Sequence, residues 1–217
     1  MSVRFSFVAP AIAGLLFASP VAAQTPAPAA AQPGATAPAP APNAWNIDSA
    51  HSQAGFAVKH MMVSNVRGSF GSTKGTILWD GKDISRVQAE AVIDATTITT
   101  NNAKRDTHLK SPDFFDVEKF PTITFKSKRA EAAGDGKFKL IGDLTMRGVT
   151  KEVTLDVEGP SQQLVSQGRA RIGATATTKI NRHDYGVSWS TKLDGGGLVV
   201  SDDVLITLEL ELVKPQS

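Results

Sequence analysis

The residue types best suited to chemistry gather in one stretch, Asn101 to Ser127. Arg105, Asp106 and His108 lie almost side by side within it. In a helix, residues three apart share a face, so Arg105 and His108 would lie together and Asp106 would point elsewhere. The arginine could clamp an anionic or carbonyl head group, with the histidine as a second donor. The alternative is a structural ion pair that fixes this segment to a neighbouring strand through Lys59 or Asp116.

Catalytic and metal-binding patterns are weak in this chain. There is no Gly-x-Ser-x-Gly elbow, and Ser111 before Pro112 is typical of a residue that caps the start of a short helix. Cysteine is absent, and no local zinc-site spacing joins the four histidines, His51, His60, His108 and His183. We therefore expect no metal, no cofactor and no enzyme. The catalytic alternative is an acid–base pair of Asp106 and His108.

The chain begins with a segment typical of export. Residues 1–23 combine a basic Arg4, an apolar run from Phe5 to Phe17 and small residues before a cleavage site, which predicts a signal peptide and a periplasmic location. The run is too short to span a bilayer. Residues 24–43 are nearly all Ala, Pro, Gln, Thr and Gly, which is typical of a flexible linker. Residues 44–217 have the size of one domain.

Charge and cysteine content exclude several functions. Beyond residue 43 the acidic and basic residues nearly balance, so the domain lacks the basic footprint of a nucleic-acid-binding protein. The absence of cysteine excludes disulfides and thiol chemistry. An exported domain of this kind must rely on its apolar core for stability.

The remaining elements are strands. Apolar and polar residues alternate in many short runs, most clearly from Val204 to Leu212, and Gly and Asp turns join them. This pattern predicts an all-β fold, either an antiparallel sandwich or a barrel, with a helix only between 101 and 116. Polar outward faces argue against an outer-membrane barrel. Small inward residues favour an open lumen: Ala89, Ala91, Ala174 and Ala176.

Several stretches together resemble the YceI-like family of exported, polyisoprenoid-binding bacterial proteins. The most specific is the Arg-Asp-x-His-Leu run with Asp-Phe-Phe after it, and the resemblance covers about Ala44 to Val213. The stretches are Ala50–Ser52, Phe56–Phe70, Asn101–Leu109, Ser111, Asp113–Asp116, Phe120–Phe125 and Gly142–Thr150. The resemblance implies a lipocalin-like antiparallel β-barrel of about eight strands, a short helix near its mouth and a long lumen for a lipid.

The predicted function is that of an exported soluble carrier or buffer of a polyisoprenoid or other long-chain, quinone-like amphiphile. Arg105 and His108 would hold the head group. Homodimers and transient contact with a membrane or membrane protein are further expectations. The alternatives to a carrier are an enzyme that acts on an isoprenoid-type lipid through His108 and Asp106, and a non-catalytic interaction module with a filled core. The residues expected to line the lumen and its rim are Phe56, Val58, Met62, Phe70, Leu109, Phe114, Phe115, Phe125, Leu144 and Trp189.

Overall fold

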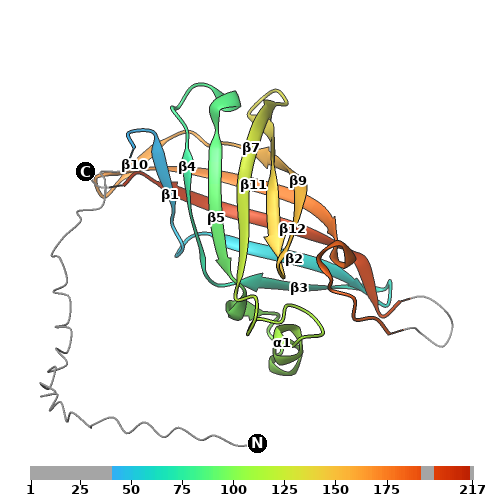
Figure 1. The fold of residues 1–217 in the computed structure, drawn as a ribbon. Coiled ribbons are helices and arrows are strands. Elements are labelled where there is room, and N and C mark those ends of the chain that lie inside the picture. The colour runs from blue at the N-terminus through green and yellow to red at the C-terminus, as the bar shows by residue number, and fades with distance from the viewer. Residues whose placement is uncertain (1–40, 192–197, 216–217) are drawn as a thin grey trace, which may run out of the picture. The chain divides into compact units, whose positions relative to one another are not determined.

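The computed structural model describes residues 41–191 and 198–215. The predicted signal peptide and nearly all of the predicted linker lie outside these residues. The described part contains one α-helix, α1, and twelve strands that hydrogen-bond into a single antiparallel sheet (Figure 1). No helix among these residues is long and apolar enough to cross a membrane.

The sheet closes on itself as a barrel with eight strand positions, here called staves, and this confirms the predicted fold. Three of the staves are each made of two strands that follow one another along a neighbour. The first stave is β1 (Ala44–Ile47) and β2 (Gln53–His60), the second is β3 (Ser64–Phe70) and β4 (Thr73–Leu78), and the third is β5 (Gln88–Asp94) and β6 (Ile98–Thr99).

Five long strands complete the ring. These are β7 (Thr122–Ala132), β8 (Lys137–Met146), β9 (Val149–Glu158), β11 (Arg169–Asn181) and β12 (Val200–Val213), and β12 closes the ring by pairing with β11 on one edge and with β1 and β2 on the other. The short β10 (Leu164–Ser166) pairs only with the start of β11. Turns of the 3-10 type follow β4, β5 and β11 at Ile84–Arg86, Ala95–Thr97 and Arg182–Tyr185.

Local sequence explains the tight turns. Arg147 and Gly148 join β8 to β9, and both have positive φ angles, 54° and 75°, as a two-residue hairpin requires. Gly142 lies within β8 where β7 comes very close, because a Cβ there would meet the Lys126 carbonyl oxygen at 2.4 Å. Glycine at this position permits the close approach of the two strands.

The wall of the barrel is uneven. The β11–β12 ladder runs from Arg171 to Asn181, whereas β9 pairs with β11 only from Thr175 to Thr177. Beyond this short ladder, Tyr185 belongs to the same buried cluster as Met146 and Ile180, and it is only 1% exposed. Burial raises the pKa of Tyr185 to about 12. Side-chain packing therefore replaces backbone pairing at this end.

The helix α1 spans Ala103–Lys110 and lies where β5 ends and β7 begins (Figure 1). Its N-cap is Asn102, whose side chain accepts a hydrogen bond from the Arg105 backbone. The prediction that Ser111 starts a helix is wrong. Ser111 ends α1, and its hydroxyl donates to the His108 carbonyl at 2.7 Å. The described chain after Pro112 forms turns and not a second helix, and Asn102 is the residue that caps the start of α1.

Candidate functional site

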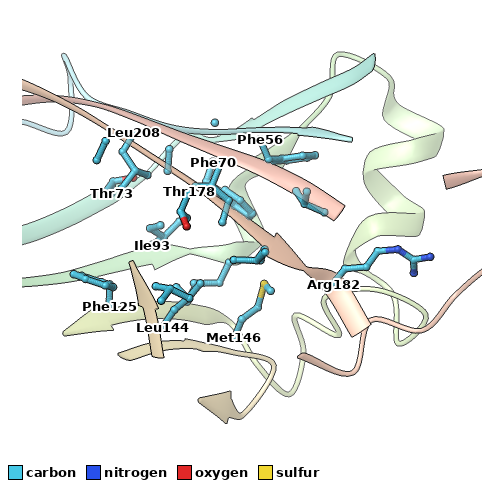
Figure 2. A pocket seen from close by; sticks show the side chains of 18 of the residues that line it. Phe56, Phe70, Thr73, Ile93, Phe125, Leu144, Met146, Thr178, Arg182 and Leu208 are labelled. Carbon is cyan, nitrogen blue, oxygen red and sulfur yellow. The ribbon is translucent and has the colours of Figure 1, made fainter. Parts of the chain in front are cut away.

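The interior of the barrel holds a cavity of about 390 Å³. Its lining is mostly apolar and comes from nearly every stave; Figure 2 shows Phe56, Phe70, Ile93 and Leu144 pointing into the same space. This volume lies in the range of small-molecule sites. A filled core, the basis of the alternative interaction module, does not describe this interior.

Nearly all residues that the sequence predicts for the lumen line this cavity. Leu109 lies on α1, and Phe114, Phe115 and Trp189 lie in the segments beside it. Arg105 and His108 also reach the cavity. The other predicted residues that line it are Phe56, Val58, Phe70, Phe125 and Leu144. Period-two alternation was a sound guide to which strand faces point inward.

Met62 is the exception, and the prediction that it lines the lumen is wrong. Met61 and Met62 form the turn between β2 and β3, with φ angles of 52° and 58°. Met62 is 65% exposed. The prediction assumed that the alternating strand from Ala54 continues through Met62. Positive φ is uncommon for residue types other than glycine, so local sequence gave no signal.

Arg105 and Asp106 both attach α1 to the end of β6. The Thr100 backbone N–H and hydroxyl donate to Asp106 Oδ1, the former at 2.8 Å, and the Thr99 hydroxyl donates to Oδ2 at 3.2 Å. These bonds lower the pKa of Asp106, and the bond from the Thr100 hydroxyl has the largest effect. Arg105 donates from Nε to the Thr100 hydroxyl at 2.7 Å and from Nη2 to its carbonyl at 3.1 Å.

The structural ion pair expected to fix this segment to a neighbouring strand through Lys59 or Asp116 is absent from the part of the chain that the structure describes. Asp116 pairs with Lys119 at 3.3 Å, and Arg105 and Asp106 bond to Thr99 and Thr100 instead. Arg105 anchors α1 through Nε and Nη2 and also lines the cavity. Its Nη1 takes part in neither of the two Thr100 bonds.

His108 joins three segments at the mouth. Its Nε2 lies 2.9 Å from Asp113 Oδ2, and its ring meets Phe114 and Trp189 edge-on at centroid distances of 5.0 and 5.4 Å. Phe114 and Trp189 also contact each other at 5.3 Å. The aromatic cluster of His108, Phe114 and Trp189 therefore forms a part of the cavity wall beside α1. The catalytic pair of Asp106 with His108 does not form, because Thr100 holds Asp106 and Asp113 holds His108.

Sequence reasoning missed Arg182, which positions Trp189. Arg182 is 4% exposed and lines the cavity (Figure 2). Its Nη1 donates to the carbonyls of Val187 and Trp189 at 2.9 and 2.7 Å, and its Nε donates to Ser201 at 3.0 Å. Burial lowers its pKa, and Asp202, 3.2 Å away, opposes that effect. An arginine in an irregular, aromatic-containing stretch was the one available signal.

One cluster outside the barrel interior has the composition of a cation site, namely Asp48, His51 and Glu211. Arg171 already bridges its two carboxylates, contacting Asp48 at 3.0 Å and also Glu211. The hydrogen bond from His51 is the main cause of the lowered pKa of Asp48. Such contacts are those of a surface ion-pair network, and we assign no metal to it.

Comparison with known proteins agrees with this architecture. A family model of the YceI-like domain matches residues 45–212. UPF0312 proteins of Staphylococcus aureus strains MSSA476 and USA300 are 40% identical over 162 residues, which covers 74% of this chain and 91% of theirs. The crystal structure of Campylobacter jejuni YCEI protein aligns with a TM-score of 0.63 and 30% identity, over 73% of this chain and 90% of that one.

Two more distant structures share the fold. BcnA of Burkholderia cenocepacia aligns with a TM-score of 0.65 and 22% identity, over 76% of this chain and 98% of its own. A polyisoprenoid binding domain from Saccharophagus degradans aligns with a TM-score of 0.58 and 18% identity, over 79% and 98% respectively.

Proposed function

Because the chain belongs to the YceI-like domain family, we propose that it carries or buffers a polyisoprenoid or another long-chain amphiphile in its lumen. The observation that carries the proposal is the apolar cavity of about 390 Å³ inside a closed barrel. The Saccharophagus degradans domain of the same fold is a polyisoprenoid binding domain, which supports this class of ligand. The proposal includes no catalytic step.

The lumen provides the binding energy for the tail. Each methylene moved from water into an apolar site contributes about 0.8 kcal/mol, so a tail of several isoprene units would offset the cost of association. Inward residues of the staves contact such a tail on all sides. Little of the lining could hydrogen-bond, which suits a hydrocarbon and gives no preference for one chain over another.

The mouth sets the orientation of the ligand. Arg105 is held by Thr100 through two of its nitrogens, and its remaining Nη1 is suited to an anionic or carbonyl oxygen of a head group. His108 lies on the same helix and also lines the cavity. The aromatic cluster of His108, Phe114 and Trp189 would shield the tail beneath the head group.

The export signal that the sequence predicts for residues 1–23 supports a periplasmic place of action for this carrier. Gentle purification followed by solvent extraction and mass spectrometry tests the proposal directly. We expect a long-chain amphiphile in stoichiometric amount. A protein that returns empty and also excludes long-chain fluorescent probes would refute it.

A matched pair of variants on β5 tests whether the ligand lies in the lumen. Ala89 lines the cavity and is 8% exposed, whereas Val92 on the opposite face is 45% exposed. We expect Ala89→Phe to fill part of the lumen and reduce the bound amount, and Val92→Phe to leave it unchanged. Equal loss in both variants would show that the ligand is not held inside.

A further inference from the structure

The turn between β2 and β3 presents three consecutive apolar side chains to solvent. Met61, Met62 and Val63, here called the β2–β3 tip, are 44%, 65% and 84% exposed. Single exposed apolar residues are ordinary on protein surfaces, but a contiguous group at a projecting turn marks an interaction site more often. Nothing in the proposed lumen or mouth uses these side chains.

The tip is held in a defined conformation. The Met61 backbone N–H donates to the Val199 carbonyl at 2.9 Å, and the Val63 N–H donates to the His60 carbonyl at 3.0 Å. Met61 and Met62 both have positive φ angles, which residues with a side chain adopt at a cost. The fold therefore tolerates local strain and presents apolar side chains where Asn or Gly would be the less strained choice.

The tip lies at the rim of the cavity. His60 and Val58 precede it on β2, Val66 follows it on β3, and all three line the cavity. Val200, which pairs with His60 at the start of β12, lines the cavity as well. A surface that engaged the tip would lie against the opening through which a ligand must pass.

Among the described residues, the charge around the tip is positive. From Ser49 to Trp79 the sequence contains no acidic residue, and Lys59 and Arg67 are exposed on the strands that flank the tip. The acidic residues nearest in the β-ladder, Asp202 and Asp203 on β12, are already paired. Their partners are Arg182, His183 and Lys179. An apolar tip with basic flanks matches an anionic bilayer surface.

We propose that the β2–β3 tip inserts into the surface of an anionic bilayer and brings the rim of the cavity against the membrane. A long-chain lipid would then pass between bilayer and lumen with little exposure to water. The proposal rests on the carrier function for what is delivered, whereas docking of the tip is a separate property that can be measured without any ligand.

Vesicle flotation of the mature protein tests the proposal, using phosphatidylcholine vesicles with and without phosphatidylglycerol. The double variant Met62→Asn, Val63→Ser removes apolar area without adding charge, and asparagine tolerates the positive φ of Met62. The matched control is Leu164→Asn, Val165→Ser on β10, whose side chains are 64% and 65% exposed. β10 pairs with the start of β11, whereas the end of β11 pairs with residues of β12 that lie beside β2 just before the tip. The control site is therefore at the other end of β11 from the tip.

We expect the wild type and the β10 control to float with anionic vesicles. The tip variant should bind these vesicles at least about tenfold more weakly. Lys59→Gln should weaken binding about fivefold, and only to the anionic vesicles. The proposal is overturned if the wild type stays in solution, or if the tip and β10 variants lose binding equally.

A parallel measurement of lumen ligand separates the two ideas. A protein that holds a long-chain lipid but ignores vesicles would leave the carrier function standing and refute the tip. A protein that docks through the tip but has an empty lumen that excludes probes would refute the carrier function and leave docking of the tip standing.

Discussion

Replacing Arg182 by methionine should disconnect the segment that carries Trp189 from the barrel. The arginine is buried on the cavity wall and donates to three backbone carbonyls, those of Val187, Trp189 and Ser201. Methionine fills a similar volume but donates no hydrogen bond. The three carbonyls would lose their partner at a site where water reaches them poorly.

The size of the effect follows from these contacts. A hydrogen bond from a charged donor contributes about 1.5–3 kcal/mol, and breaking a buried charged network by removing one member costs about 3–5 kcal/mol. The Asp202 carboxylate is 40% exposed and keeps His183 at 2.7 Å, so it is not left alone. We therefore expect Arg182→Met to lower the free energy of unfolding by about 3–4 kcal/mol.

Urea denaturation measures this change, and acrylamide quenching of tryptophan fluorescence reports on Trp189. Quenching should increase in Arg182→Met, with Trp189→Phe identifying the signal. Arg129→Met is the matched control, because Arg129 is 54% exposed and pairs only with surface carboxylates. It should cost less than about 1 kcal/mol. Equal stability of the two variants, with unchanged quenching, would refute the role assigned to Arg182.

Three further perturbations have defined outcomes. Asp106 has a lowered pKa in the folded protein, so its contribution to the free energy of unfolding is fully present above its unfolded pKa of about 4. This contribution is lost as the pH falls through the lower folded value. Asp106→Asn should therefore flatten the dependence of the Tm on acid pH in thermal melts. The Thr73 hydroxyl is buried at the cavity and has no hydrogen-bond partner among the described residues, so Thr73→Val should leave the free energy of unfolding unchanged or raise it by about 1 kcal/mol in urea titrations. Gly142→Ala should lower the free energy of unfolding by about 2 kcal/mol or more, because its Cβ would meet the backbone of β7. Gly71→Ala, whose Cβ would have its nearest neighbour at 3.8 Å, should change it by less than about 0.5 kcal/mol in the same titration.

The strands and their inward faces could be predicted because burial of one face imposes a period of two on the sequence. Leu144 on β8 and Phe125 on β7 are examples, since each alternates with outward polar residues and lines the cavity. The hairpin at Arg147 and Gly148 could be predicted for a related reason, because glycine supplies the positive φ that the turn needs.

Other features could not be derived from local sequence. The Met61–Met62 turn uses residues that rarely adopt positive φ, and a hydrogen bond from the Met61 N–H to the carbonyl of Val199, far along the chain, helps to hold it. Ser111 before Pro112 suits either the start or the end of a helix, and in the structure it ends the helix that Asn102 caps. Three of the four hydrogen bonds of Arg182 go to backbone carbonyls, which every residue offers, so the residue types in the sequence reveal little of its contacts.

A hollow barrel has a consequence for stability. The outer faces carry many cross-strand ion pairs, such as Lys126 with Glu90 and Lys137 with Glu158, but these are largely exposed and each contributes little. The apolar lining must therefore provide most of the stabilisation, yet around the cavity it lacks the contacts that a filled core would make.

Ligand binding would supply those missing contacts. A ligand that binds only the folded state adds about 2.7 kcal/mol when its free concentration is a hundred times its Kd. For a protein of this size that gain corresponds to a rise in Tm of roughly 5–10 °C. A filled interaction module has no room for such a ligand and would show no comparable shift. The Tm of delipidated protein, measured before and after adding a long-chain isoprenoid, therefore separates a carrier from an interaction module, and a carrier must show the rise.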